Sequence, residues 1–374
     1  MKVISSKGEY EKMQKGLKGV IAAETSISFI DGERGILVYR GYGAKDLALQ
    51  YTFEEVAYLL WYGHLPSTHE LHTVSQALGQ GRILPFHVYE VIRALPKGMD
   101  MMNQILTAAS ALGAEQTPSI EQAIRLTAAV PVIISAIYRK ERGLSPLQPS
   151  AELRHAENYL YMLTGTVPAA SHARALEAYM VLTMEHGMNA STFAARVISS
   201  TESDMAAAVS GAIGAMKGPL HGGAPTGVID MLNEINEQGS AEVWLRQKLE
   251  RNEHIMGFGH RVYKTSDPRA EALREITAHA GKNDDWLRLA GEVETTAIKL
   301  LAQYKPGRKL YTNVEFYAAA VMRALDMETS LFTPTFTASR TVGWTAHILE
   351  QAADNTIFRP ESRYIGTLMN EITK

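Results

Sequence analysis

Two histidines of this chain stand beside glycines, in the segments Gly218–Ala224 and Met256–Arg261. Glycine leaves the backbone uncovered, so a ligand can approach such loops closely. A neutral imidazole at His221 can donate a hydrogen bond to a carbonyl that is turning into an enolate, as fixed donors do in oxyanion holes. A histidine that caps a tight turn explains His221 equally well. The loop of His260 also carries arginine and lysine, and this mixture favours an anion site over a solvated loop.

A carboxylate and three further cationic side chains extend this set. Glu315 opens an apolar run, where a carboxylate with a tuned pKa can act as a general base. Periodicity alone favours a simpler interpretation, an acidic residue in the first turn of a helix. His186 ends an apolar helix, as capping histidines often do. Arg340 and Arg359 can each bind an anion, although either one alone is more typical of surface charge.

Composition excludes several other kinds of chemistry. The 374-residue chain has no cysteine, so disulfides, thiolate catalysis and cysteine-based zinc sites are ruled out. None of the histidines at 186, 221 and 260 lies four residues from another, so no helical zinc site is predicted. The net charge of −3 lacks the basic excess typical of nucleic-acid or membrane-surface proteins. The polar start and the short apolar runs predict a cytoplasmic protein.

The elements that must position these residues are mostly helices. Thr25–Ile30 and Ile36–Tyr39 are rich in β-branched residues and flank the turn-forming Asp31–Gly35, which predicts a hairpin. Capping boxes open helices at Thr52, Ser67 and Ser119. Helical periodicity covers about 52–62, 119–139, 151–163, 170–186, 189–200, 202–216, 225–237, 241–251, 268–280, 284–303, 315–325 and 337–353.

Several motifs together resemble the citrate synthase family. Gly257–Arg269, which reads GFGHRVYKTSDPR, closely resembles the family signature, and Gly218–Ala224 resembles its first active-site histidine loop. Glu185–Thr192 resembles its oxaloacetate-binding segment. Asn313–Tyr317 stands where the family has Asn-Val-Asp. The likeness runs from the hairpin to Phe358–Pro360 and therefore covers nearly the whole chain.

The resemblance implies a fold and an assembly. The fold is all-α, with a short N-terminal β-hairpin, a large helical domain formed by residues 1–221 and 326–374, and a smaller helical domain formed by residues 222–325. The smaller domain would close over substrate, and two subunits would form a homodimer. The chain resembles the short bacterial and archaeal form of the family.

The resemblance also implies a mechanism. Glu315 would remove a proton from the methyl group of acetyl-CoA, and His221 would stabilise the enol or enolate. His260 would polarise and protonate the ketone of oxaloacetate as the new carbon–carbon bond forms. Hydrolysis of citryl-CoA would then release citrate and CoA. No metal or redox cofactor is implied, because the CoA thioester is a substrate.

Binding residues follow from the same motifs. His186, Arg269 and Arg340 would hold the carboxylates of oxaloacetate. Arg359 would reach the site from the partner subunit. Contacts to the phosphates of CoA are expected from Arg261, Lys264, Arg308 and Lys309.

One residue departs from the family pattern, because the family base is an aspartate and this chain has Glu315. Both are carboxylates of similar pKa, but glutamate is longer by one methylene. Displacing a catalytic group by about 1 Å can cost roughly a hundredfold in rate. The glutamate therefore makes a catalytically weak, ligand-binding relative one alternative to citrate synthase. The other alternative is a 2-methylcitrate synthase, which would use the same residues with propionyl-CoA.

Overall fold

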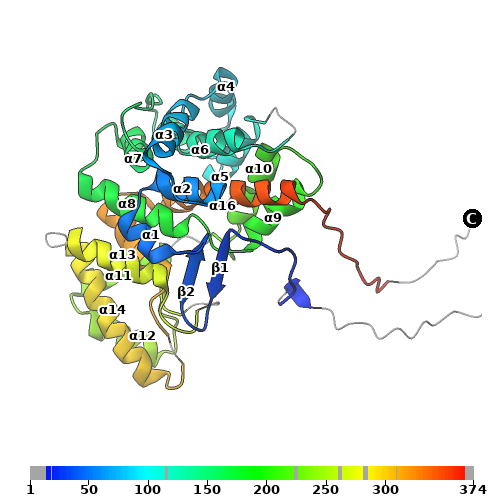
Figure 1. Ribbon diagram of the computed structural model, residues 1–374. Coiled ribbons are helices and arrows are strands. Elements are labelled where there is room, and N and C mark those ends of the chain that lie inside the picture. The colour runs from blue at the N-terminus through cyan, green and yellow to red at the C-terminus, as the bar shows by residue number, and fades with distance from the viewer. Residues whose placement is uncertain are drawn as a thin grey trace, which may run out of the picture.

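The described part of the chain is a bundle of helices with one small sheet (Figure 1). A computed structural model describes residues 14–17, 19–113, 117–222, 226–259, 263–280, 285–308 and 310–366. The helices are η1 (Lys15–Leu17), α1 (Ala44–Gln50), α2 (Phe53–Tyr62), α3 (Thr68–Gly81), α4 (Phe86–Ala94), α5 (Met101–Ser110), α6 (Ile120–Glu141), α7 (His155–Thr164), α8 (Ala170–Thr183), α9 (Ala190–Ser199), α10 (Met205–Met216), α11 (Thr226–Gln238), α12 (Ala241–Glu250), α13 (Pro268–Ala280), α14 (Asp285–Tyr304), α15 (Val314–Ala324), η3 (Thr329–Leu331) and α16 (Phe332–Ala353). The predicted all-α class is confirmed.

The predicted hairpin forms two strands of a three-stranded antiparallel sheet, with its second strand in the centre. Strand β1 (Ser28–Asp31) pairs with β2 (Ile36–Tyr39), and β2 pairs with the short β3 (Tyr42–Gly43). The Asp31 carboxylate accepts backbone hydrogen bonds from Glu33 and Arg34, both at 3.0 Å, which closes the turn. The first strand begins later than expected from the sequence.

The three capping boxes are present as predicted. At the start of α2, the side chain of Glu55 accepts a hydrogen bond of 2.7 Å from the amide of Thr52, and the Thr52 hydroxyl accepts one of 3.3 Å from the amide of Glu55. Such reciprocal bonds satisfy amides that have no partner inside the helix. The same arrangement opens α3 at Ser67 and α6 at Ser119.

The sequence patterns missed three helices and misplaced the start of a fourth. Helices α1 and α4 follow Gly43 and Pro85, neither of which donates or accepts a side-chain capping bond. Helix α5 follows Asp100, whose carboxylate does cap it. Helix α16 starts at Phe332 rather than near residue 337. Pro334 does not interrupt this helix because it lies in the first turn, where no amide hydrogen is needed.

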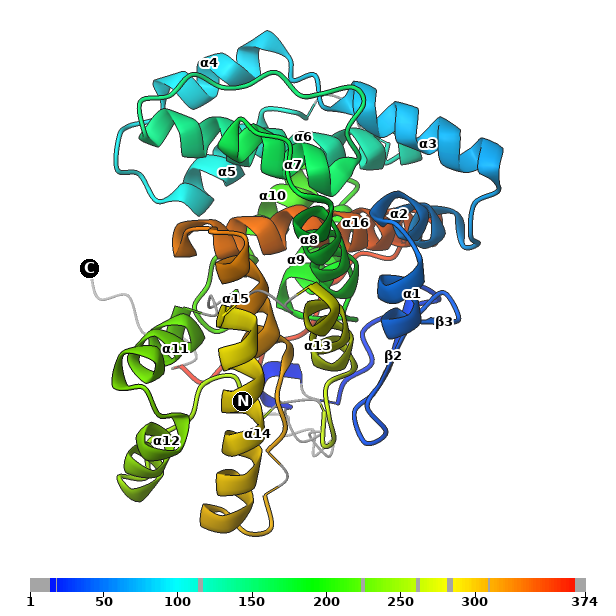
Figure 2. The same ribbon diagram turned by 90° about the vertical axis from the view of Figure 1, so that its left-hand side faces the viewer.

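Helices α6 and α16 form much of the core. Helix α6 is long and apolar enough to cross a membrane, but 83% of its apolar window is buried inside the protein, as expected of a core helix. Helix α16 packs against α6, α8 and α9. Helices α11 to α15 belong to the predicted small domain and gather at one end of the molecule in Figure 2, with α13 packed against α1 and α8.

Candidate active site

His221 follows α10 and is held as a neutral ring. The Ser191 amide donates to its Nε2 at 3.3 Å, and the Ser191 hydroxyl lies 2.7 Å from the same nitrogen. Because Nε2 accepts this amide hydrogen bond, the neutral ring carries its proton on Nδ1. Trp344 of α16 donates to the Ser191 hydroxyl at 3.0 Å and so fixes it in place. Burial, together with the charge of Arg340, lowers the pKa of His221 to about 4.

Two buried arginines lie within electrostatic reach of each other, and one of them, Arg340, also acts on the His221 ring. Arg340 of α16 is 1% exposed and donates from Nε to the carbonyl of Thr183 at 2.6 Å. Burial lowers the pKa of Arg340, and the positive charge of Arg269 acts in the same direction. Among the described residues, no carboxylate lies within ion-pair distance of Arg340. Arg340 therefore makes no ion pair in the described structure, although the charge of the buried Glu185 raises its pKa against these effects.

Arg269, by contrast, has a carboxylate partner. It is 5% exposed, near the start of α13, and its Nε and a terminal nitrogen contact the two oxygens of Asp267 at 3.0 and 2.8 Å. Burial alone lowers the pKa of Arg269, but Asp267 outweighs this effect and the pKa is raised. This bidentate pairing fixes the plane of the guanidinium group.

His186 lies on the loop between α8 and α9 and joins this group through Tyr263. Its Nε2 is 3.1 Å from the Tyr263 hydroxyl, and the two rings meet edge to face. The guanidinium carbon of Arg269 lies 5.7 Å from the centre of the Tyr263 ring. Tyr263 therefore contacts both His186 and Arg269, which come from segments far apart in the chain.

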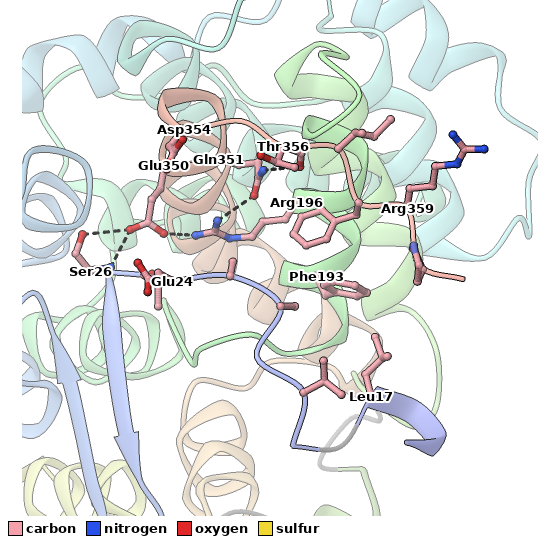
Figure 3. Close-up of a pocket in the computed structure, with 17 residues that line it drawn as sticks. Leu17, Glu24, Ser26, Phe193, Arg196, Glu350, Gln351, Asp354, Thr356 and Arg359 are labelled. Carbon is pink, nitrogen blue, oxygen red and sulfur yellow. Dashed lines mark hydrogen bonds and ion pairs between the residues drawn. The ribbon is translucent and has the colours of Figure 1, made fainter. Parts of the chain in front are cut away.

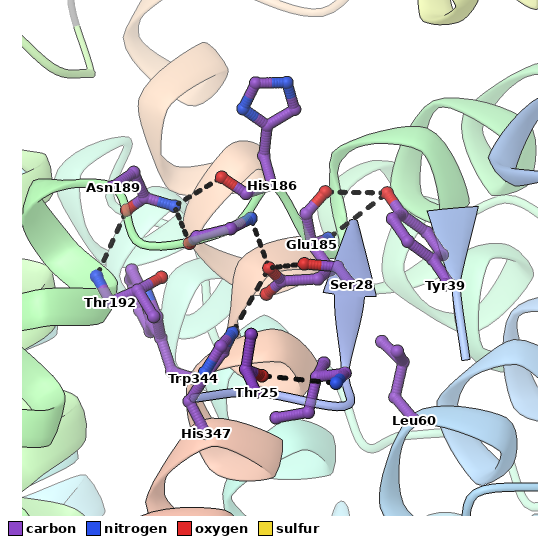
Figure 4. A network of polar contacts seen from close by, with 12 residues as sticks. Thr25, Ser28, Tyr39, Leu60, Glu185, His186, Asn189, Thr192, Trp344 and His347 are labelled. Carbon is purple, nitrogen blue, oxygen red and sulfur yellow. Dashed lines mark hydrogen bonds and ion pairs between the residues drawn. The ribbon is translucent and has the colours of Figure 1, made fainter. Parts of the chain in front are cut away.

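A buried polar network turns His186 away from the core, as Figure 4 shows. The fully buried carboxylate of Glu185 accepts hydrogen bonds from the Gly187 amide and, at 2.9 Å, from the Ser28 hydroxyl. It also pairs at 3.2 Å with His347, whose other ring nitrogen receives a hydrogen bond of 3.1 Å from Arg196. Burial raises the pKa of Glu185, but His347 and Arg340 outweigh it, so the net pKa is lowered.

Glu315 is the second residue of α15, and its amide is capped by Asn313 at 3.0 Å. Its side chain remains open to solvent. The surrounding protein still shields it enough to raise its pKa; the charge of Arg269 opposes this effect, and that of Asp267 adds to it. A raised pKa makes a carboxylate a better general base near neutral pH.

The turn before Glu315 is joined to the loop that leads to His260. The Gly259 amide donates to the Tyr311 carbonyl at 2.7 Å, and the Asn313 amide donates to the Gly257 carbonyl at 2.9 Å. The Asn313 side chain adds a bond of 2.9 Å to the Gly259 carbonyl. Gly257 and Gly259 have φ values of 80° and 87°, where other residues are strained.

The remaining predicted site residues are more scattered. His260, Arg261 and Lys309 lie outside the described residues. Lys264 has an exposed side chain, and its amide donates to the Gly32 carbonyl in the hairpin turn at 2.8 Å. Arg308 lines a hollow of about 510 Å³ together with His254 and Lys305.

Arg359 is exposed and points away from the other residues that line its groove. It lies at the rim of a groove of about 800 Å³ between the N-terminal segment and helices α9 and α16, and its guanidinium group points outward in Figure 3. The preceding Phe358 is held against α9 by a hydrogen bond of 3.1 Å from its amide to the Ser200 hydroxyl and by edge-to-face contact with Phe193. In the described part of the chain, no contact joins Arg359 to the group around His221.

Four further residues lie inside the sequence motifs, but no role for them is predicted from the motifs: Glu185, Ser191, Tyr263 and Asp267. Each acts on the site through contacts to distant segments, which spacing along the chain does not reveal. Asp267 alone carries a local signal, since an aspartate followed by proline is typical of a helix start.

The candidate site of this helical protein combines a neutral histidine in the turn after α10, a carboxylate on α15, and buried arginines on α13 and α16. A family model described as citrate synthase, C-terminal domain, matches residues 16–361. The chain belongs to the citrate synthase family.

Individual relatives agree with this assignment. The chain is 40% identical to a citrate synthase of Mycolicibacterium smegmatis, over 97% of each chain. It is also 40% identical to a 2-methylcitrate synthase of Mycobacterium tuberculosis, over 96% of this chain and 92% of that one. Its fold is similar to that of citrate synthase from Thermoplasma acidophilum in a ternary complex with carboxymethyl coenzyme A and oxaloacetate. That structure has a TM-score of 0.86 and 29% identity, with 97% of this chain and 98% of the other covered.

Proposed function

We propose that this chain condenses acetyl-CoA with oxaloacetate and hydrolyses the product to citrate and CoA. The observation that carries the proposal is a buried arginine, Arg340, which makes no ion pair in the described structure and lies within electrostatic reach of His221 and Arg269. Arg269 and Arg340 are buried and repel each other, and of the two only Arg269 makes an ion pair with a carboxylate among the described residues. A small dianion such as oxaloacetate would give Arg340 a carboxylate to pair with.

In this mechanism Glu315 takes a proton from the methyl group of the thioester. His221 donates a hydrogen bond to the thioester oxygen as negative charge develops there, and its lowered pKa favours the neutral form that this role needs. His186 and the two arginines orient oxaloacetate for attack by the new carbon nucleophile. His260 is proposed to protonate the ketone oxygen, and Arg261, Lys264, Arg308 and Lys309 to contact the phosphates of CoA.

A second candidate is condensation of propionyl-CoA to 2-methylcitrate. It is favoured by the 2-methylcitrate synthase of M. tuberculosis, which is as similar to this chain as the citrate synthase of M. smegmatis is. One methylene in an apolar pocket is worth about 1–3 kcal/mol of discrimination, so one site can accept both thioesters. The longer base also leaves open a ligand-binding relative with little turnover.

One assay separates these three functions. CoA thiol release is followed with oxaloacetate and either acetyl-CoA or propionyl-CoA. A higher kcat/KM with acetyl-CoA supports the first proposal, and a strong preference for propionyl-CoA would overturn it in favour of the second. Absence of release with both would favour the ligand-binding protein.

Two variants test the base. Glu315→Gln removes the charge but keeps the shape, so we expect nearly all turnover to be lost while oxaloacetate still binds. Near-normal turnover would remove Glu315 from the mechanism. Glu315→Asp restores the family residue and should change kcat more than the KM for oxaloacetate, because the methylene alters reach rather than charge.

We further propose a cytoplasmic homodimer, without metal or redox cofactor, in which Arg359 completes the site of the partner subunit. Support comes from its exposed guanidinium group, which points away from the other residues that line the groove (Figure 3). The inactive variants Arg359→Gln and Glu315→Gln are unfolded together, mixed and refolded. If Arg359 acts across the interface, mixed dimers regain one intact site and activity returns to about a quarter of the wild-type value. Absence of recovery in confirmed mixed dimers would place Arg359 in its own subunit's site or outside the mechanism.

A further inference from the structure

Asp267 is a buried carboxylate that connects two parts of the candidate site. It is 1% exposed and precedes α13. Its Oδ1 accepts from the Nε and the amide of Arg269, both at 3.0 Å, and its Oδ2 accepts from a terminal nitrogen of the same arginine at 2.8 Å. Its Oδ2 also accepts from the amide of Val314 at 3.2 Å. One carboxylate therefore contacts the starts of both α13 and α15.

The bond to Val314 is informative because Val314 is the first residue of α15 and Glu315 is the second. The amides at a helix start have no partner inside the helix. One of those amides is satisfied here by the residue that also holds Arg269. The position of Glu315 is therefore tied to the position of the arginine that would bind oxaloacetate.

We propose that Asp267 is a positioning residue that couples the oxaloacetate-binding Arg269 to the catalytic Glu315. The inference rests on the proposed function of the site. Arg269 and Asp267 pull the Glu315 carboxyl in opposite directions, the first lowering its pKa and the second raising it. A substrate carboxylate on Arg269 offsets the first effect and leaves the second, so Glu315 becomes the stronger base once oxaloacetate is bound.

Other titratable groups around this pair do not replace Asp267. Those within electrostatic reach of Arg269 or Glu315 are Tyr39, Tyr179, Tyr263 and Arg340, from β2, α8, the segment before α13, and α16. Burial raises the pKa of each tyrosine, so these three stay neutral near pH 7. Asp267 is the one carboxylate that contacts both Arg269 and α15 within the described residues.

The chain offers a matched control in Glu294 of α14. This carboxylate is also buried, at 7% exposure, and supports the turn before Glu315 and the start of α15. It accepts hydrogen bonds from Thr312 at 2.7 Å and from Tyr317 at 2.5 Å. In the described structure it does not contact Arg269. Loss of Glu294 therefore measures the effect of loosening the turn without disturbing the arginine.

A second variant cuts one contact of Asp267 without removing its charge. Val314→Pro deletes the amide hydrogen that Asp267 accepts and leaves the ion pair with Arg269 intact. Proline is well tolerated at the first position of a helix, and the preceding Asn313 already has the extended conformation that proline requires.

The experiment measures CoA thiol release against pH and oxaloacetate concentration for Asp267→Asn, Val314→Pro and Glu294→Gln. For Asp267→Asn we expect the KM for oxaloacetate to rise about tenfold or more, and the acid limb of the kcat profile to move to lower pH. Val314→Pro should lower kcat with little change in that KM. Glu294→Gln should leave both the KM and the acid limb near the wild-type values.

Three results would overturn the inference. The first is an Asp267→Asn enzyme with wild-type KM and acid limb, and the second is a Glu294→Gln enzyme with the same shifts as Asp267→Asn. The third is a Val314→Pro enzyme with wild-type kcat, and this variant decides alone if Asp267→Asn does not fold. A wild-type enzyme that releases no CoA from either thioester would instead contradict the proposed function, and oxaloacetate binding measured by calorimetry would then test the role of Asp267 at Arg269 separately.

Discussion

Replacing Gly343 by alanine should destabilise the protein, although the same change in most helix interiors is stabilising. Gly343 lies inside α16, where alanine is normally favoured over glycine by about 1 kcal/mol. A Cβ at this position would lie 2.4 Å from the carbonyl oxygen of Met184 and 2.5 Å from Oε2 of Glu185. Real Cβ contacts are almost never shorter than 3.0 Å, so the backbone or the buried carboxylate has to move.

The magnitude follows from what has to move. Overpacking a core costs about 1–3 kcal/mol, and breaking a buried ion pair costs about 3–5 kcal/mol. Glu185 is fully buried and pairs with His347 at 3.2 Å, so a shift of more than half an ångström weakens that pair. We expect the free energy of unfolding to fall by about 1–3 kcal/mol. The KM for oxaloacetate should also rise, because Glu185 precedes His186 and bonds the amide of Gly187.

The assay is urea unfolding followed by circular dichroism at one fixed protein concentration, because association shifts the midpoint. Gly291 in α14 is the matched control: a Cβ there meets nothing within 4 Å, so Gly291→Ala should stabilise by up to about 1 kcal/mol. A fall in the free energy of unfolding for Gly343→Ala and a rise for Gly291→Ala would support the reasoning. A Gly343→Ala protein as stable as the wild type would refute it.

Three further predictions concern other buried groups. Burial lowers the pKa of His155 well below its ordinary value, and neither ring nitrogen has a hydrogen-bond partner among the described residues. His155→Phe should therefore raise the free energy of unfolding by about 1–3 kcal/mol. Urea unfolding should show a larger gain at pH 5 than at pH 8. Because the pKa of His221 is lowered to about 4, its contribution to stability should be complete above pH 6.5 and should be lost as pH falls towards 4; NMR titration of the ring should give a midpoint near pH 4. Ser191→Ala removes the hydroxyl beside His221 Nε2, so kcat should fall roughly tenfold while the KM for oxaloacetate stays nearly constant.

Local patterns predicted elements well where the signal was local. The capping boxes at Thr52, Ser67 and Ser119 and the hairpin turn at Asp31 all depend on bonds between residues two or three positions apart, which a sequence displays directly. Helices α1 and α4 lack such caps and form through packing instead. Tertiary contacts outweigh weak local preference in such segments.

The candidate site was only partly predictable for the same reason. The glycine loops predicted ligand-binding segments, and the resemblance to the family linked His186, Arg269 and Arg340 to one substrate. Sequence could not show that Asp267 contacts Val314, 47 positions away, or that Glu185 pairs with His347. For Glu315, helix periodicity favoured a simple first-turn acid, and only the surroundings of the folded chain show a carboxylate with a raised pKa.

The bonds between Gly257–Gly259 and Tyr311–Asn313 also bear on how this enzyme can be modified. Three hydrogen bonds connect the two segments, although more than fifty residues separate them in the chain. A chimera should therefore exchange both segments together. A chimera that imports an aspartate-bearing turn from a relative, without its matching glycine loop, would combine two surfaces that were not selected together. Exchanging both segments at once gives a clean way to ask how the length of the base affects the rate.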